Sequence, residues 1–183
     1  MGSEMCIRDS YSTAHAKAEA PIAAGMGLQF EIGLRAAEVV SCQECLPGWA
    51  IKLRQGRSDL YLTDSGQKGA RPRTIYIHPE KMAAVLAAVN AALACTENGT
   101  QFLIASKNGK SAKALYLSRL KNLGISGDQS SHSMRRRFAV DQYQLYMAAG
   151  DSHRLALSKC AMDLGHGDRR GNLVWNSYIK NSL

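Results

Sequence analysis

Residues 131–138 read Ser-His-Ser-Met-Arg-Arg-Arg-Phe, and the spacing of their side chains decides how this part of the chain folds. His132 and Arg135 are three residues apart, so a helix places an imidazole and a guanidinium on one face. Met134 and Phe138 fall on a different side, which suits a hydrophobic core. The pattern predicts a helix that packs inward and presents both polar groups to a ligand. Taken alone, His-x-x-Arg is more typical of a solvated helix face.

The first part of the chain combines a helical segment with a short sheet. Residues 14–40 have a helical pattern, with breaks expected around Gly25-Met26-Gly27 and near Gly33. Beyond the turn at Pro47-Gly48, apolar and polar residues alternate in three short segments, which predicts strands. These strands, expected to form an antiparallel meander, are Trp49–Leu53, Asp59–Thr63 and Arg73–His78.

The rest of the chain is predicted to be mainly helical. Pro79 can occupy the first turn of a helix. One apolar stripe then follows at helical spacing, formed by Met82, Leu86, Val89 and Leu93, and Asn98-Gly99 ends this helix. Further helices are expected around Leu115–Leu123 and over about residues 131–149, 152–164 and 173–179. The predicted fold class is α+β, a mostly helical domain with a small three-stranded antiparallel sheet.

The composition suits one domain of ordinary size. The chain has 183 residues, 45% of them hydrophobic, and contains no uncharged apolar run long enough for a membrane span. Five cysteines without regular spacing favour a reducing compartment, and the start lacks the pattern of a secretion signal, so a cytoplasmic location is expected. Residues 1–12 show no regular period and are expected to be a non-native or disordered leader, which leaves residues 13–183 as the domain.

The charge is distributed unevenly along the chain. Residues 1–100 contain 10 basic and 10 acidic side chains, whereas residues 101–183 contain 13 basic and 5 acidic ones, so the second part carries the whole net charge of +8. A one-sided excess of this kind is expected of a protein that binds a polyanion. Many soluble proteins are basic without such a partner, so the charge gains weight only from the motifs that share this part of the chain.

Two other kinds of site lack support in the sequence. Cys42-x-x-Cys45 has no second pair of ligands at zinc-site spacing. No glycine-rich phosphate loop followed by Lys and Ser or Thr occurs either. We therefore expect neither a metal ion nor a nucleotide cofactor.

Five short segments, read in order, share one chemistry. They are Gly33-Leu34-Arg35-Ala36-Ala37-Glu38, Lys68-Gly69-Ala70-Arg71-Pro72-Arg73, His132-Ser133-Met134-Arg135, Leu164-Gly165-His166 and Asn176-Ser177-Tyr178. Guanidinium groups bind phosphate through a planar fork of donors and stay charged at any relevant pH. The order and local patterns of the segments resemble the catalytic domain of the tyrosine recombinases, the phage-integrase family, over about residues 20–180.

The resemblance implies a role for each polar residue of the set. Arg35 and Arg135 would hold one DNA phosphate from two helices, with His132 on the same helix face as Arg135 and with Glu38 orienting Arg35. His166 would donate to a non-bridging phosphate oxygen.

A lysine in the predicted hairpin completes the cationic set. By the resemblance, Lys68 would protonate the leaving 5′ oxygen, a task that requires the lysine to reach that atom. Arg71 and Arg73 are competing candidates for the same role, and a hairpin lysine is more often simply solvated.

Tyr178 is the expected nucleophile, and it departs from the family pattern in one respect. Family members typically place the tyrosine nine residues after the histidine, whereas Tyr178 is twelve residues after His166 and position 175 is Trp. The additional residues are expected to lengthen the loop over residues 167–172. Tyr143 and Tyr146 lie on the predicted His132 helix and are expected to pack in the core.

The reaction implied by the resemblance breaks and rejoins DNA strands. The tyrosine attacks a phosphodiester to give a 3′-phosphotyrosine and a free 5′-hydroxyl, and a second 5′-hydroxyl then reverses the step. Neither metal nor ATP is required, because the covalent link keeps the bond energy. A type IB topoisomerase and a non-catalytic DNA-binding module of the same fold are alternatives.

Double-stranded DNA is the expected partner, bound by a homo-oligomer, a tetramer. Further contacts to the DNA backbone are expected from Arg136, Arg137, Arg169 and Arg170, which flank the motifs. Family members usually carry an N-terminal helical domain that completes the grip on DNA, and this domain is expected to be absent here.

Overall fold

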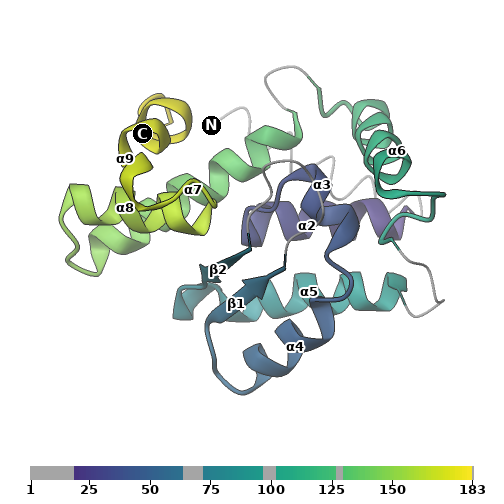
Figure 1. The fold of residues 1–183 in the computed structure, drawn as a ribbon, viewed down its shortest axis with the longest axis horizontal. Coiled ribbons are helices and arrows are strands. Elements are labelled where there is room, and N and C mark those ends of the chain that lie inside the picture. Colours follow the sequence, from purple (N-terminus) through teal and green to yellow (C-terminus); the bar gives the residue numbers. More distant parts are fainter. Residues whose placement is uncertain (1–18, 64–71, 97–101, 127–129, 183) are drawn as a thin grey trace.

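The computed structural model describes residues 19–63, 72–96, 102–126 and 130–182. Its main elements are α2 (Ala20–Ile32), α3 (Ala36–Ser41), α4 (Leu46–Arg54), β1 (Asp59–Leu62), β2 (Arg73–Tyr76), α5 (Met82–Thr96), α6 (Gly109–Asn122), α7 (Ser131–Ala148), α8 (His153–Asp163) and α9 (Gly171–Val174). In Figure 1, the sheet lies with α4 and α5, whereas α7, α8 and α9 form a separate layer and α6 lies at the opposite side. The predicted α+β class, mostly helical, is confirmed.

Helix α2 is the central element of the core. It packs against α5 and α7, and its buried residues lie all around the helix. The expected break at Gly25-Met26-Gly27 is wrong, since α2 continues through these residues. A Cβ on Gly25 would lie 2.9 Å from Val39 Cγ1 and 3.0 Å from the Tyr116 ring, so this glycine permits close packing instead of ending the helix.

The break predicted near Gly33 is confirmed. Gly33 ends α2 with φ 70°, and its N–H donates to the Gln29 carbonyl. A Cβ at this position would lie 2.3 Å from Phe138 Cδ1 on α7, so both the backbone conformation and the space require glycine. The chain turns sharply here, which places Arg35 directly before α3.

The sheet has two strands among the described residues, and the prediction of a third is wrong. β1 and β2 pair antiparallel, with Leu60 opposite Ile75. The expected first strand, Trp49–Leu53, belongs to helix α4. Leu46, Trp49, Ala50 and Leu53 are the buried residues of α4, and their spacing is that of one helical stripe, which the apparent alternation over five residues concealed.

The later helices agree with the sequence. A 3₁₀ turn at Pro79–Lys81 leads into α5, and α7 and α8 lie within one residue of their predicted ends. The expected end of α5 at Asn98-Gly99 lies outside the described residues, as do the expected leader and the tip of the hairpin. None of the described helices is long and apolar enough to cross a membrane.

Candidate active site

A buried carboxylate, Glu38, is the centre of the candidate site. Arg35 is the N-cap residue of α3, and its backbone N–H donates to Glu38 Oε2 at 2.7 Å. The Arg35 guanidinium also donates to Glu38 Oε1 at 2.8 Å. Glu38 therefore caps the helix and also contacts the arginine that it was expected to orient. A plain surface ion pair is excluded because the Glu38 side chain is only 1% exposed.

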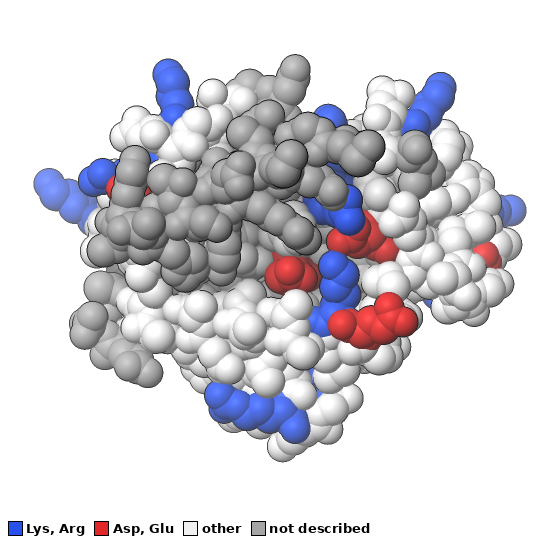
Figure 2. Space-filling view, turned by 180° about the vertical axis from the view of Figure 1, so that it is seen from behind, with Lys and Arg blue, Asp and Glu red and all other residues white. Residues whose placement is uncertain are grey.

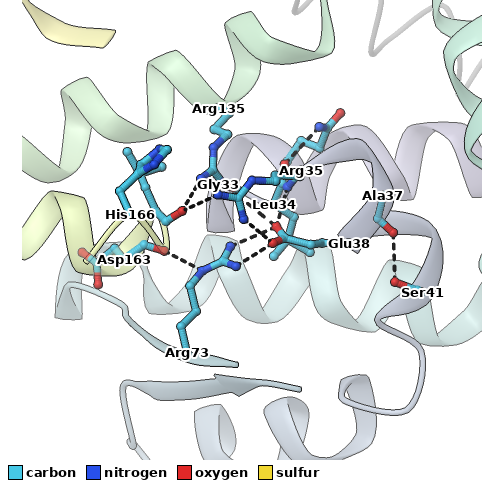
Figure 3. A network of polar contacts seen from close by, with 12 residues as sticks. Gly33, Leu34, Arg35, Ala37, Glu38, Ser41, Arg73, Arg135, Asp163 and His166 are labelled. Carbon is cyan, nitrogen blue, oxygen red and sulfur yellow. Dashed lines mark hydrogen bonds and ion pairs between the residues drawn. The ribbon is translucent and has the colours of Figure 1, made fainter. Parts of the chain in front are cut away.

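Arg73 holds the same carboxylate from the sheet. Its Nη1 and Nη2 donate to the two Glu38 oxygens at 2.6 and 2.9 Å, and its Nε donates to the Asp163 carbonyl at 2.9 Å. Figure 3 shows the Arg73 and Arg35 guanidiniums converging on Glu38 from two directions. By sequence, Arg73 was expected only as a competitor of Lys68 for the role of proton donor. The missed signal was its place on β2, where Arg73 shares the buried face with Ile75.

Arg135 reaches the site from α7 and is almost fully buried, with 2% of its side chain exposed. Its guanidinium donates to the carbonyls of Gly33 and Leu164, and Nη1 lies 4.0 Å from Glu38 Oε2. Burial, followed by the charges of Arg35 and Arg73, lowers the pKa of Arg135 to about 10, so Arg135 is still cationic at neutral pH. We call Arg35, Arg73 and Arg135 together with Glu38 the arginine cluster.

The electrostatics of the arginine cluster favour a charged Glu38. Burial alone would raise the pKa of this carboxyl, but hydrogen bonds and charges from Arg73 and Arg35 lower it to about 2. Three guanidiniums around one carboxylate leave an excess of positive charge. This excess is the electrostatic condition that a phosphate site requires.

The C-terminal end of α8 completes the arginine cluster. The Leu164 carbonyl accepts from Arg135 and, at 3.3 Å, from Arg35 Nη2. Carbonyls at a helix C-terminus have no partner within the helix and carry partial negative charge, so they suit guanidinium donors. Gly165 has φ 70°, and a Cβ there would lie 2.8 Å from Arg73 Cδ.

The turn that follows brings His166 towards the proposed nucleophile. The backbone N–H of His166 donates to the Ala161 carbonyl, and the side-chain Nε2 of His166 lies 3.4 Å from the Tyr178 hydroxyl. The centroid of the His132 ring lies 5.0 Å from that of the Tyr178 ring. Tyr178 itself is 6% exposed. The structure thus brings both histidines next to the Tyr178 ring, although the three residues are separated by up to 46 positions.

Both imidazoles are held in their neutral form near neutral pH. Burial, followed by the charge of Arg135, lowers the pKa of His166 to about 4. The same two causes, in the same order, lower the pKa of His132 below its ordinary value of 6.5. A neutral imidazole beside a phenol can accept a hydrogen bond or a proton from it.

The segment between His166 and Tyr178 is more ordered than the expected loop. It forms a 3₁₀ turn at Asp168–Arg170, then α9, then a π-helical turn at Trp175–Ile179, which we call the tyrosine turn. In this turn the Lys180 N–H donates to the Trp175 carbonyl, five residues back. π-helical turns are frequent at functional sites. The long spacing is therefore taken up by helical turns, and Tyr178 still reaches His166.

The remaining predicted residues lie at the edge of the site or outside the residues that the structure describes. Lys68 and Arg71 are outside the described residues. Arg136, Arg169 and Arg170 are exposed, and Arg170 lines an open cavity of about 590 Å³ together with Arg35, Arg73 and His166. Arg137 forms an ion pair with Asp141 at 2.7 Å. Tyr143 and Tyr146 are buried, as predicted.

The charged surface is mixed rather than uniformly basic on the face drawn in Figure 2. Acidic and basic side chains lie side by side near the centre of this face, and single basic side chains project at its edges. Among the described residues, no group of three His, Cys, Asp or Glu side chains is placed to hold a metal ion.

A mostly helical domain with a small antiparallel sheet is consistent with the α+β fold of the phage-integrase type of tyrosine recombinase domain. A family model described as Integrase matches residues 1–141, so the chain belongs to this integrase family. The match includes the segments of Arg35 and Arg135 and ends before His166 and Tyr178. No curated protein and no solved structure matches the chain. Family membership supports DNA binding and a site-specific recombinase function.

Proposed function

We propose that the chain cleaves and rejoins DNA through Tyr178. The hydroxyl oxygen attacks a DNA phosphodiester, forms a 3′-phosphotyrosine and expels a 5′-hydroxyl, and a 5′-hydroxyl from another strand reverses the step. The observation that carries the proposal is the position of Tyr178, 3.4 Å from His166 Nε2 and in ring contact with His132. A phenol is a weak nucleophile at neutral pH, and an adjacent base with nearby cations is what activates it.

The proton of Tyr178 passes to His166 in this proposal. The lowered pKa of His166 keeps its imidazole neutral at neutral pH, and the negative charge of the bound phosphate offsets the arginine charges that otherwise oppose its protonation. The cationic arginine cluster then lowers the energy of the phenolate and of the phosphorane that follows. Lys68 supplies the proton for the leaving 5′ oxygen, as the family resemblance implies.

Arg35 and Arg135 bind the phosphate with unequal exposure. The side chain of Arg35 is 32% exposed, whereas that of Arg135 is 2% exposed. A guanidinium has five N–H donors, and the carbonyls of Gly33 and Leu164 occupy two of those of Arg135, which leaves donors for a phosphate oxygen. Arg35 is therefore the first contact of an entering phosphate, and Arg135 the deeper one.

The proposal extends to the assembly and its location. Exchange of strands between two duplexes needs several active tyrosines, so we propose that the chain acts as a homotetramer on double-stranded DNA in the cytoplasm. The phosphotyrosine keeps the energy of the broken bond, so the reaction as proposed consumes no ATP and uses protein cations in place of a metal.

A suicide DNA substrate tests the proposed nucleophile. A nick just downstream of the cleavage site lets the short fragment that carries the new 5′-hydroxyl diffuse away, so that a covalent protein–DNA adduct accumulates and survives denaturation. Tyr178→Phe should bind the duplex as tightly as the wild type and give no adduct. The matched control is Tyr143→Phe, which changes a buried tyrosine on α7 in the same way.

Three results would separate the alternatives. A normal adduct from Tyr178→Phe would refute the assignment of the nucleophile. A wild-type chain that binds DNA without any adduct would identify a non-catalytic module. Adduct formation and relaxation of supercoils without exchange between two duplexes would indicate topoisomerase activity.

A further inference from the structure

Asp163, the last residue of α8, is a buried acid beside the arginine cluster. Asp163 is only 4% exposed. The Tyr146 hydroxyl donates to Asp163 Oδ2 at 2.7 Å, and the backbone N–H of Tyr76 donates to Asp163 Oδ1 at 3.0 Å. Tyr146 lies on α7 and Tyr76 on β2, so this carboxylate joins three elements. Buried carboxylates are rare unless they are paired or bonded in this way.

The backbone carbonyls of Asp163 and of the next residue supply one acceptor to each of the three arginines. The Asp163 carbonyl accepts from Arg73, and the next carbonyl, that of Leu164, accepts from Arg35 and Arg135. The position of this turn therefore fixes one carbonyl acceptor for each of the three guanidiniums. His166 follows two residues later, so the same turn also sets its distance from Tyr178.

We propose that Asp163 is a positioning residue for the recombinase site: its carboxylate accepts from Tyr146 and from the Tyr76 N–H and so sets the turn that holds the arginines and His166, and loss of its charge weakens that hold. The inference rests on the proposed function. Asp163 touches neither the phosphate nor the nucleophile in this proposal. It acts through the Leu164 carbonyl and through His166.

The groups that face Asp163 come from each element packed against it. They are Tyr146 from α7, Tyr76 and Arg73 from β2, and Lys159 and Cys160 from α8. Burial raises the pKa of Asp163 to about 6, and the bonds from Tyr76 and Tyr146 and the charges of Arg73 and Lys159 oppose this rise. Burial also raises the pKa of Tyr146 and of Cys160, so both keep their protons in this range. Asp163 is the member of this set that changes charge near pH 6.

The charge at Asp163 opposes folding. Its pKa rises from 3.8 when unfolded to about 6 when folded, so the folded state binds the proton more tightly. Stability contributed by the protonated form is therefore lost as the pH rises through about 6. An uncharged amide would suit the fold at least as well, which points to a role for the charge in the site rather than in stability.

Single-turnover cleavage of the suicide substrate between about pH 5 and about pH 8 tests the inference. The wild-type rate should fall as the pH drops through about 6. At about pH 8, Asp163→Asn should cleave the substrate about tenfold more slowly than the wild type, as expected when the arginines and His166 are misplaced. Its affinity for DNA should be unchanged. Its cleavage rate should not fall as the pH drops through the range in which the wild-type rate falls. Tyr146→Phe removes one donor to the carboxylate, so its decline should move to higher pH. Tyr143→Phe, whose hydroxyl bonds His153 instead, should retain the wild-type profile.

Thermal unfolding supplies a measurement that needs no DNA. At about pH 8, Asp163→Asn should melt at or above the wild-type temperature, and this advantage should shrink as the pH falls and wild-type Asp163 takes up its proton. A melting temperature lowered equally at every pH would show a purely structural residue and overturn the inference. An acid decline shared by the wild type and Asp163→Asn would assign it to His132 and would also overturn the inference. A wild type without any adduct would instead refute the proposed function and this inference together.

Discussion

The arginine cluster and the tyrosine turn are held in place in different ways. Glu38 receives four hydrogen bonds from Arg35 and Arg73, and Arg135 donates to two carbonyls from separate segments. The Tyr178 hydroxyl, by contrast, has one contact of 3.4 Å to His166, supported by ring contacts with the two histidines. The cations are thus fixed before substrate arrives, whereas the nucleophile is restrained by packing. Fixed charge suits stabilisation of a transition state, and a loosely bonded hydroxyl can shift onto a phosphate.

Within the arginine cluster, the largest effect is expected from Glu38→Gln. The variant keeps the shape of the side chain but leaves the guanidiniums of the arginine cluster without their shared countercharge. Breaking a buried ion pair costs about 3–5 kcal/mol, and cleavage should fall by about a hundredfold as the arginines lose their positions. Chemical denaturation and suicide-substrate cleavage measure the two effects.

Ser41→Ala provides the control for this variant. Ser41 lies on the same helix and its hydroxyl donates to the Ala37 carbonyl, so the loss of this bond should cost less than about 1 kcal/mol. Equal stabilities for Glu38→Gln and the wild type would contradict the central place given to this carboxylate.

The same carboxylate predicts an acid limit to stability. The pKa of Glu38 is lowered from 4.5 to about 2, so its stabilising contribution is present above about pH 4.5 and is lost as the pH falls towards 2. Wild-type stability should therefore decline in this interval, and Glu38→Gln should decline less steeply. Parallel curves of unfolding free energy against pH would place the acid sensitivity in another group.

Replacing Arg35 or Arg135 by lysine should show how a partly exposed and a buried arginine of the arginine cluster differ in their effects on cleavage and stability. Either change keeps the charge and loses the planar fork, so cleavage should fall by more than about tenfold, or roughly 1.4 kcal/mol. Arg135→Lys should also lower stability by about 2 kcal/mol because two buried carbonyls lose their donor. Arg35→Lys should cost less stability, because Arg35 is partly exposed. Cleavage within twofold of the wild type in both variants would remove the argument from guanidinium geometry.

A smaller effect is expected in the tyrosine turn. Trp175 packs against His153 and Tyr143, with ring centroids 4.9 and 6.0 Å away. Trp175→Ala should slow cleavage several-fold, by about 1 kcal/mol, because the turn that carries Tyr178 loses its packing. Trp175→Phe keeps an aromatic ring and should recover most of the rate. If alanine and phenylalanine slow the reaction equally, ring packing does not hold the nucleophile.

The smallest effect is expected outside both regions, at the arginines that flank the motifs. Neutralising Arg136, Arg137, Arg169 and Arg170 should flatten the dependence of DNA affinity on salt, by about 0.9 in the log–log slope for each lost phosphate contact. Arg137 should contribute least, because it already pairs with Asp141. Neutralising Arg54 and Arg57, from the half of the chain without net charge, is the control. Superimposable slopes for the fourfold variant and the wild type would show that the grip on DNA lies elsewhere.

Local sequence patterns predicted the features that depend on near neighbours. The ends of α7 and α8, the break at Gly33 and the buried tyrosines of α7 follow from spacing and from the backbone freedom of glycine. Local patterns failed at α4, where five residues fitted both periods, and at Gly25, where a glycine serves close packing rather than a break. At α4 the helical period shows only over a longer stretch of sequence, whereas at Gly25 the ring of Tyr116, distant in sequence, decided the outcome.

By itself, then, the sequence determined the order of the cationic motifs, the helical frame around them and the place of Tyr178 after His166. Only the tertiary structure decided that Arg73 shares Glu38 with Arg35, and that the end of α8 accepts from the arginines. The reason is physical, since these bonds join residues 35, 90 and 129 positions apart. A helical or strand period relates a residue to neighbours within about one turn. Partners at such separations meet only when the core brings their elements together.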